Sequence, residues 1–124
     1  MNKADKSIIC TSFSSGKKHD FKVFQESKVR AKPETKITAD TAFIGIKKIH
    51  ANSDIPRKRS KHRPLTCEDK VHNREISNER IDVENVIGFI KRFKIISDRY
   101  RNRRKRFGLR INLIAGICNV DRMI

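Results

Sequence analysis

The stretch from Thr66 to about Phe93 most constrains the fold of this chain, because it combines a helix start signal with a long helical pattern. Its first four residues, 66–69 (TCED), have the T-x-x-D form of a capping box, in which the end side chains bond each other's backbone amides. Apolar residues then recur at helical rather than alternating spacing: Ile76, Val83, Val86, Ile87 and Ile90. The sequence therefore predicts a long helix that ends near Phe93, with a break near Ser77–Asn78.

Shorter elements are expected on either side of this helix. They are strands over 7–13 (SIICTSF) and 36–39 (KITA), and helices over 19–28, 43–50 and 107–120. Asp20 is the expected N-cap of the first of these helices. The element order is that of an α/β chain, but two strands are too few for an independent sheet of ordinary size. We therefore expect an upstream part of the sheet to be missing.

The charge of the chain points to a polyanionic partner. Lys and Arg number 30 against 14 Asp and Glu, which gives a net charge of +16. A chain this basic favours nucleic acid over an acidic membrane surface. The cations are densest in two expected loops, 52–64 and 98–106, where aromatic residues are too few to signal base stacking. Contacts to phosphate are predicted for Arg57, Lys58, Arg59, Lys61, Arg103, Arg104 and Lys105.

Several protein classes are disfavoured by the cysteines and by hydropathy. Cys10, Cys67 and Cys118 are odd in number and far apart, which argues against a disulfide scaffold or a zinc ribbon. No apolar run approaches the roughly 20 residues that a membrane helix needs, and the apolar patch near the N-terminus is too short for a signal peptide. The expected location is cytoplasmic, in association with the nucleoid.

Two carboxylates are candidate metal ligands for metal-dependent cleavage of a phosphodiester bond. Such chemistry takes acids from different elements that converge on divalent ions. Asp40 directly follows the expected strand 36–39, so a buried strand would deliver it to a sheet edge. An acid at a strand end is also a common turn former, which leaves a structural role open for Asp40.

Glu84 is the second candidate, on the long predicted helix. Arg80 lies four residues before it and Lys91 seven after, so all three are expected on one helix face. A carboxylate, a guanidinium and an ammonium on one face could bind a metal and hold the surrounding phosphates. From spacing alone, the alternative of an ordinary surface ion pair between Arg80 and Glu84 is favoured.

A family resemblance adds to these interpretations. Arg80, Glu84 and Lys91 match the Y-x-x-R-x-x-x-E-x-x-x-x-x-x-K signature of bacterial insertion-sequence transposases with a DDE active site, with Ser77 in place of the Tyr. The text RIDVENVIGFIKRF resembles the R-x-x-V-E-N-x-I-G-x-x-K-x-F form of the DDE endonuclease branch that includes Harbinger-type elements. Around Asp40, ADTAFIGI resembles the family's A-D-x-G-Y-x-G, and upstream GKKHDFKVFQES resembles its G-x-x-H-D-F-x-x-F-x-x-S.

The resemblance implies a role for each matching residue. Asp40 and Glu84 would be the second and third catalytic acids and would bind Mg²⁺ or Mn²⁺, while Arg80 and Lys91 would hold phosphate. Residues 1–124 would be the C-terminal part of a transposase catalytic domain with a partial RNase H-like fold that lacks its first strand. The implied partner is DNA, both at the ends of the insertion element and at the target site. The missing N-terminal part of the transposase, or a second copy of this chain, is a further implied partner.

The first acid of the family, in a D-G-T-like segment, has no counterpart in this chain. We therefore expect the chain alone to bind DNA without cleaving it. The alternative is a small basic protein that binds nucleic acid or associates with the ribosome and has no catalytic history. That alternative explains the charge equally well, but it does not explain the spacing of Arg80, Glu84 and Lys91.

Overall fold

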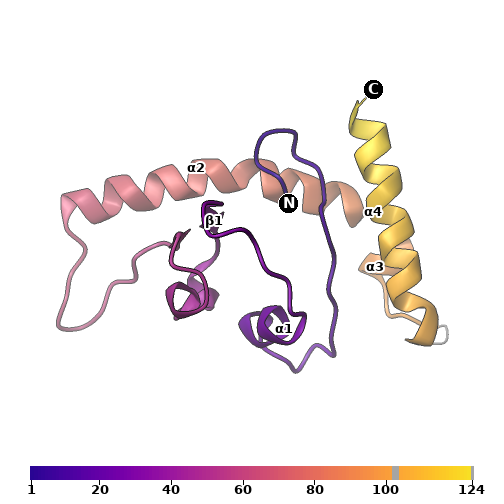
Figure 1. Cartoon of the computed structure of the whole chain (residues 1–124), viewed down its shortest axis with the longest axis horizontal. Helices are drawn as coiled ribbons and strands as arrows, with labels where there is room; N and C mark the ends of the chain where they lie inside the picture. Colours follow the sequence, from indigo (N-terminus) through magenta and orange to yellow (C-terminus); the bar gives the residue numbers. More distant parts are fainter. Residues whose placement is uncertain (102–103, 124) are drawn as a thin grey trace. The chain divides into compact units, whose positions relative to one another are not determined.

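The chain folds as a mixture of helices, short helical turns and two very short strands in this computed structural model, which describes residues 1–101 and 104–123 (Figure 1). The elements are α1 (Asp20–Glu26), β1 (Ile37–Thr38), η1 (Thr41–Phe43), η2 (Ile46–Lys48), β2 (Ser53–Asp54), α2 (Cys67–Ile90), α3 (Lys94–Ser97), η3 (Arg104–Arg106) and α4 (Phe107–Met123).

Two compact units share these elements. The middle unit is Ser14–Glu79, and the terminal unit combines Met1–Phe13 with Arg80–Ile124. The boundary between them falls inside α2, so the first part of this helix belongs to the middle unit and the rest to the terminal unit.

The long predicted helix is confirmed as α2, together with its capping box. The amide of Asp69 donates to Oγ1 of Thr66 at 3.1 Å, and the amide of Thr66 donates back to Oδ2 of Asp69 at 3.1 Å. The helix runs unbroken through Ser77–Asn78 and ends at Ile90, before the predicted end. It ends there because the amide of Phe93 bonds Ile90 three residues back, which tightens the chain into a turn.

In the middle unit, β1 and β2 pair in parallel. Ile37 lies opposite Ser53, and the amide of Ala39 donates to the carbonyl of Asp54 at 3.0 Å. The predicted strand over 36–39 is therefore confirmed in its central residues. The sequence did not predict β2, because its two residues lie in a polar segment that has the composition of a loop.

The predicted helix over 43–50 is wrong. Gly45 has a φ of +94°, a left-handed conformation that an α-helix does not accommodate, and it separates η1 from η2. Ile46, which directly follows it, is 1% exposed and anchors the core of this unit. The predicted helix over 19–28 is confirmed as the shorter α1, but its N-cap is His19, whose ring accepts the amide of Phe21, rather than Asp20.

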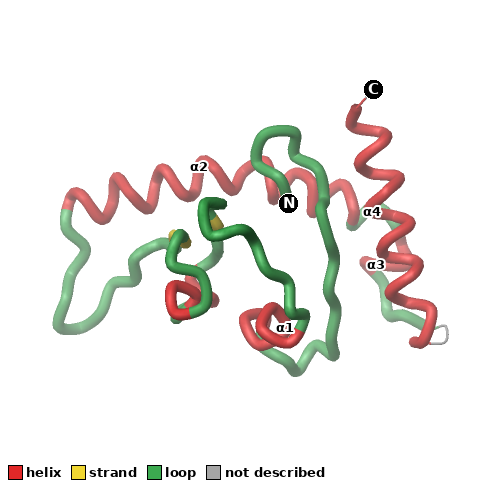
Figure 2. The backbone as a smooth tube through the Cα atoms, viewed as in Figure 1, coloured by secondary structure: helices red, strands yellow, loops and turns green. Residues whose placement is uncertain are grey.

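In the terminal unit, the predicted strand over 7–13 is wrong, since this segment is a loop (Figure 2). Its backbone is bonded by side chains of α4 instead of by another strand. The amide side chain of Asn119 accepts from the backbone N–H of Ile8 at 2.8 Å and donates to its carbonyl at 3.0 Å. The hydroxyl of Thr11 donates to Asn112 at 2.6 Å.

The predicted C-terminal helix is confirmed as α4, which extends to Met123. Its buried residues are Ile114, Ala115 and Cys118, and burial raises the pKa of the Cys118 thiol. Near the start of α4 the ring of Phe13 packs against Gly108, where an added Cβ would lie 2.8 Å from the ring, so a larger residue would require Phe13 to move. Among the helices in the described ranges, none is long and apolar enough to span a bilayer.

Candidate functional site

Glu84 lies on α2 within the terminal unit, where its carboxylate faces solvent. The Glu84 side chain is 67% exposed, and its Oε1 lies 3.8 Å from Nη2 of Arg80, whose side chain is 33% exposed. The structure therefore contains the i,i+4 ion pair that the spacing predicts, at a separation where such a pair contributes little to stability. An exposed carboxylate of this kind remains accessible to a divalent cation.

Lys91 does not lie on the helix itself. It is the first residue after the end of α2, exposed, and its amide still donates to the carbonyl of Ile87 at 3.0 Å. The expectation that Arg80, Glu84 and Lys91 share one helix is corrected in this respect. Lys91 follows in the turn, because α2 ends before the predicted point.

Asp40 lies in the middle unit, two residues beyond the end of β1, and is half-buried. It caps the helical turn η1: its Oδ1 accepts the amide of Thr41 and also the Thr41 hydroxyl, at 3.1 Å. The predicted position of Asp40 after a strand is confirmed. Asp40 also has the turn-forming role that the sequence left open, because it caps η1. The bonds to Thr41 hold the carboxyl group in one orientation at the end of the strand.

Among the four residues that match the family motifs, Asp40, Arg80, Glu84 and Lys91, the structure shows a direct contact between Arg80 and Glu84. Asp40 and Glu84 belong to different units, and each is placed only within its own, so their convergence stays a prediction. Both are oxygen donors of the type that Mg²⁺ and Mn²⁺ prefer, so their chemistry fits such an ion. Within residues 1–101 and 104–123 no three His, Cys, Asp or Glu side chains cluster as a metal site.

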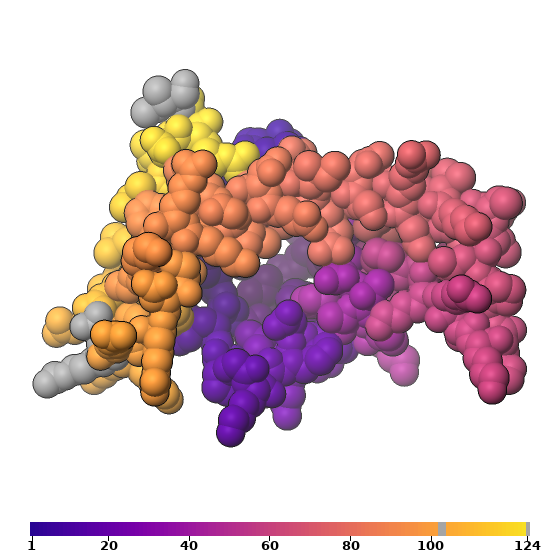
Figure 3. Space-filling model, turned by 180° about the vertical axis from the view of Figure 1, so that it is seen from behind, coloured from indigo at the N-terminus to yellow at the C-terminus, as the bar shows by residue number. Residues whose placement is uncertain are grey.

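The basic loop of the middle unit is exposed, as predicted. The pink lobe at the lower right of Figure 3 is this loop. Its cations Arg57, Lys58, Arg59 and Lys61 all have exposed side chains. In the second basic run, Arg104 and Lys105 are exposed in η3, and Arg103 lies outside the described residues.

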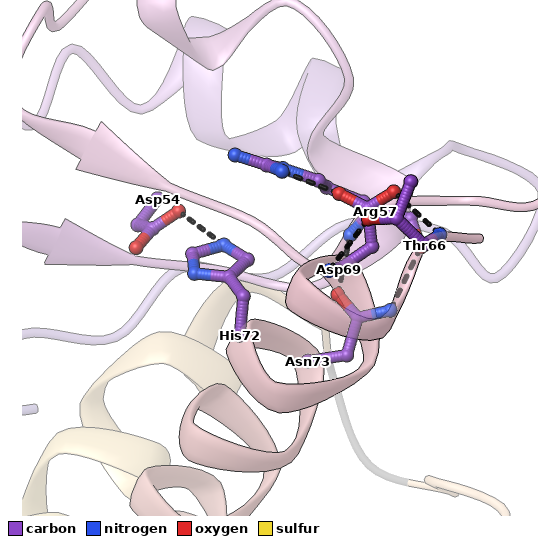
Figure 4. A network of polar contacts seen from close by, with 6 residues as sticks. All are labelled: Asp54, Arg57, Thr66, Asp69, His72 and Asn73. Carbon is purple, nitrogen blue, oxygen red and sulfur yellow. Dashed lines mark hydrogen bonds and ion pairs between the residues drawn. The ribbon is translucent and has the colours of Figure 1, made fainter.

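Arg57 differs from the other cations of this loop, because a polar network fixes it against the start of α2 (Figure 4). Its guanidinium forms an ion pair with Asp69, whose side chain is only 3% exposed. The backbone of Arg57 is bonded twice to the amide side chain of Asn73, by its N–H at 2.7 Å and by its carbonyl at 2.9 Å. Nearby, His72 lies 3.0 Å from Asp54, the second residue of β2.

Asp69 has an altered acidity because of this network. The hydrogen bond from Arg57, followed by that from the Thr66 backbone, lowers the pKa of Asp69 from 3.8 to about 2. Its charged form is thus stabilised in the folded chain more than in the unfolded chain. The resulting contribution to stability is complete above the unfolded pKa of about 4 and is lost as the pH falls toward 2.

We therefore expect acid to destabilise the chain through Asp69. Between pH 6 and pH 3 the thermal midpoint should fall, and Asp69→Asn should lower the midpoint at pH 6 and reduce this fall. The neighbouring exposed acid Glu68 offers the control, since Glu68→Gln should change the midpoint much less. Thermal unfolding monitored by circular dichroism at both pH values measures this, and equal effects of the two substitutions would contradict it.

Sequence reasoning recognised Asp69 as a member of a capping box but missed its second role. Nothing in the residues between Arg57 and Asp69 signals that the intervening loop folds back on the helix. The pairs His72–Asp54 and Lys36–Asp54, the latter at 3.4 Å, were missed for the same reason. The Lys36–Asp54 pair depends on the parallel pairing of β1 with β2, and the His72–Asp54 pair joins β2 to α2.

Comparisons with known proteins bear on this arrangement. The family described as DDE superfamily endonuclease matches residues 2–119. A curated protein named as the probable transposase for insertion sequence element IS702, from Microchaete diplosiphon, is 46% identical over 114 residues. These residues cover 92% of this chain but 41% of that relative, so the chain spans about two fifths of the relative's length. No solved structure matches the chain.

Proposed function

The chain belongs to the DDE superfamily endonuclease family, and we propose that it is part of an insertion-sequence transposase that contributes two metal-binding acids and a DNA-binding surface. The observation that carries this proposal is the solvent-facing Glu84 on α2, paired with Arg80 at the family spacing. The relative, a probable transposase, supports the assignment.

In this proposal Asp40 and Glu84 are the second and third catalytic acids. They hold a divalent ion, Mg²⁺ or Mn²⁺, which when bound supplies activation of a water or a 3′ hydroxyl for attack on a DNA phosphodiester. Arg80, one helical turn from Glu84, contributes positive charge that holds the phosphate. Lys91, exposed just past the helix end, contributes positive charge for the phosphate.

The fold proposed for the complete catalytic domain is RNase H-like. The parallel pair β1–β2 would then be part of a larger sheet, and Asp40 would lie at one edge of that sheet. Residues 1–124 would form the C-terminal part of this domain, with the first strand and the first acid supplied by residues outside these 124. Such a protein is expected in the cytoplasm, associated with the nucleoid.

We further propose that the 124-residue chain alone binds DNA without cleaving it. Binding follows from the net charge of +16 and the two exposed basic runs. Cleavage needs a complete set of acids, because a two-metal site that lacks a ligand misplaces the nucleophile. The partners are therefore DNA at element ends and target, and a segment that carries the first acid.

The test compares this chain with an extended chain that adds the upstream part of a relative, including its first acid. With Mn²⁺ and DNA that carries element ends, the extended chain should nick the DNA, and a chelator should abolish the nicking. The 124-residue chain should bind the same DNA and leave it intact. An extended chain that binds but never nicks would favour a basic nucleic-acid-binding protein without catalysis.

A further inference from the structure

A cleft in the middle unit is not used by the proposed catalytic site. Its volume is about 590 Å³, within the range of small-ligand sites in proteins. Its walls come from η2, from the segment that follows β2, from the end of the basic loop and from the first turns of α2. All of these lie within Ser14–Glu79, so the cleft belongs to a single compact unit.

The lining of this cleft is of two chemical kinds. One part is apolar and includes Ile46, Ile55 and Leu65, of which Ile46 is buried and the other two are half-buried. The other part is cationic and includes Lys47, Lys58 and Arg63, whose side chains are exposed. A ligand that fits both parts has an apolar face and at least one negative charge.

The charges of the lining do not cancel. Two acids also line the cleft, but Asp69 is paired with Arg57, and Asp54 is contacted by His72 at 3.0 Å and by Lys36 at 3.4 Å. Among the described residues, no hydrogen bond or ion pair neutralises the side chains of Lys47, Lys58 and Arg63. The cleft therefore carries a net positive charge that remains available to an anion.

One wall of the cleft is also held in place without a ligand. Arg57, in the segment that follows β2, is fixed to α2 at three points (Figure 4). Its guanidinium pairs with Asp69, and its backbone N–H and carbonyl both bond the side chain of Asn73. Lys58 is the next residue along this segment. A wall fixed in advance loses less conformational freedom when a ligand binds.

We propose that this cleft binds an unpaired nucleotide of a DNA strand, with the base against the apolar residues and the phosphate on Lys47, Lys58 and Arg63. The inference rests on the proposed function in taking DNA as the polyanion. An unpaired base offers a free apolar face, whereas in a duplex both faces of each base are stacked on neighbours. A double helix is also too wide to enter a cleft of this size, so it can contact only the exposed cations.

The experiment measures affinity of the 124-residue chain for a short thymidine oligonucleotide and for a duplex of equal length, by fluorescence anisotropy at one salt concentration. Duplex DNA has the higher charge density, so purely electrostatic binding favours the duplex. The cleft predicts the reverse order, with the single strand bound about fivefold more tightly or better, because only an unpaired base can bury its face against the apolar residues of the cleft. Leu65→Ser should remove this preference, while Val29→Ser, at an exposed apolar position outside the cleft, should leave it.

A pair of charge reversals tests the cationic part. Lys47→Glu with Lys58→Glu should weaken single-strand binding by on the order of tenfold or more. Lys17→Glu with Lys32→Glu changes the net charge equally, at exposed positions outside the cleft of the same unit, and should weaken binding only about two- to threefold. All variants affect exposed or half-exposed positions, and circular dichroism confirms that each retains its helices.

The outcomes separate the two proposals. A duplex preference that Leu65→Ser does not change, or equal losses from the two double variants, would overturn the cleft assignment and leave the proposed function intact. Failure of the chain to bind either form of DNA would instead remove the DNA partner and with it the proposed function.

Discussion

Glu84→Gln is expected to reduce metal-dependent nicking by the extended chain by at least on the order of 10²- to 10³-fold. The substitution keeps the shape of the side chain but replaces a charged oxygen ligand by a neutral amide, which binds a hard cation weakly. Because the Glu84 side chain is 67% exposed and its separation from Arg80 is long, at 3.8 Å, the substitution should scarcely affect the fold. The effect should therefore appear in the nicking rate and not in the thermal midpoint.

Glu75 provides the control for this prediction. It is also an exposed acid on α2, so Glu75→Gln makes the same chemical change on the same helix. Nicking of supercoiled DNA, followed over time at a fixed Mn²⁺ concentration, measures both variants. Retained activity in Glu84→Gln, or an equal loss in Glu75→Gln, would exclude Glu84 as a metal-binding acid.

The second large effect concerns salt and the binding of duplex DNA. For a protein that binds 6–10 phosphates, affinity falls by about 10³- to 10⁵-fold between roughly 50 and 200 mM salt, because counterions are released on binding. The exposed basic loop and η3 present enough cations to bind phosphates in this number. We expect a fall of about 10³-fold or more for the 124-residue chain, measured by anisotropy with labelled duplex.

Removal of the cations in η3 refines this prediction. Replacement of Arg104, Lys105 and Arg106 by Ala should reduce the slope of log affinity against log salt by roughly 0.9 for each phosphate that the variant no longer binds. These side chains are exposed, so the fold should be preserved. An affinity that hardly changes over this salt range would mean that the basic runs are solvated surface and not a DNA-binding site.

Local patterns predicted the helices well where the signals are contained in a few neighbouring residues. The capping box at Thr66 and Asp69 depends on a spacing of three residues, and α2 begins where this motif places it. The apolar pattern of α4 was equally sufficient. In both cases the hydrogen bonds that define the element run between residues close in sequence.

Most of the wrong or missed elements depend on interactions between residues that are far apart in the sequence. Residues 7–13 have strand-forming composition, but a strand needs a partner, and here Asn119 on α4 bonds the backbone at Ile8. The strand β2 was missed because its pairing with β1 is not visible in its own polar residues. The helix over 43–50 failed for a local reason, the left-handed Gly45, which an apolar spacing rule does not weigh.

The candidate site shows the same division. The Arg80–Glu84 pair could be predicted because the two residues are one helical turn apart. The ion pair of Arg57 with Asp69 could not, since its partners are twelve residues apart in the sequence, on either side of a loop. Asp40 and Glu84 belong to different units, so no local pattern predicts their convergence, which stays a prediction.

If Asp40 and Glu84 bind one divalent-metal centre, as we propose, an exchange of their ligand atoms tests this most directly. In the extended chain, Asp40→Cys and Glu84→Cys each replace a hard oxygen ligand by a thiolate, which prefers softer cations. We predict that each variant loses nicking with Mg²⁺ and regains a measurable part of it with Zn²⁺ or Cd²⁺, while the unsubstituted chain keeps its preference for Mg²⁺ or Mn²⁺. Loss of nicking that no cation restores in either variant, or full activity of both with Mg²⁺, would contradict the claim.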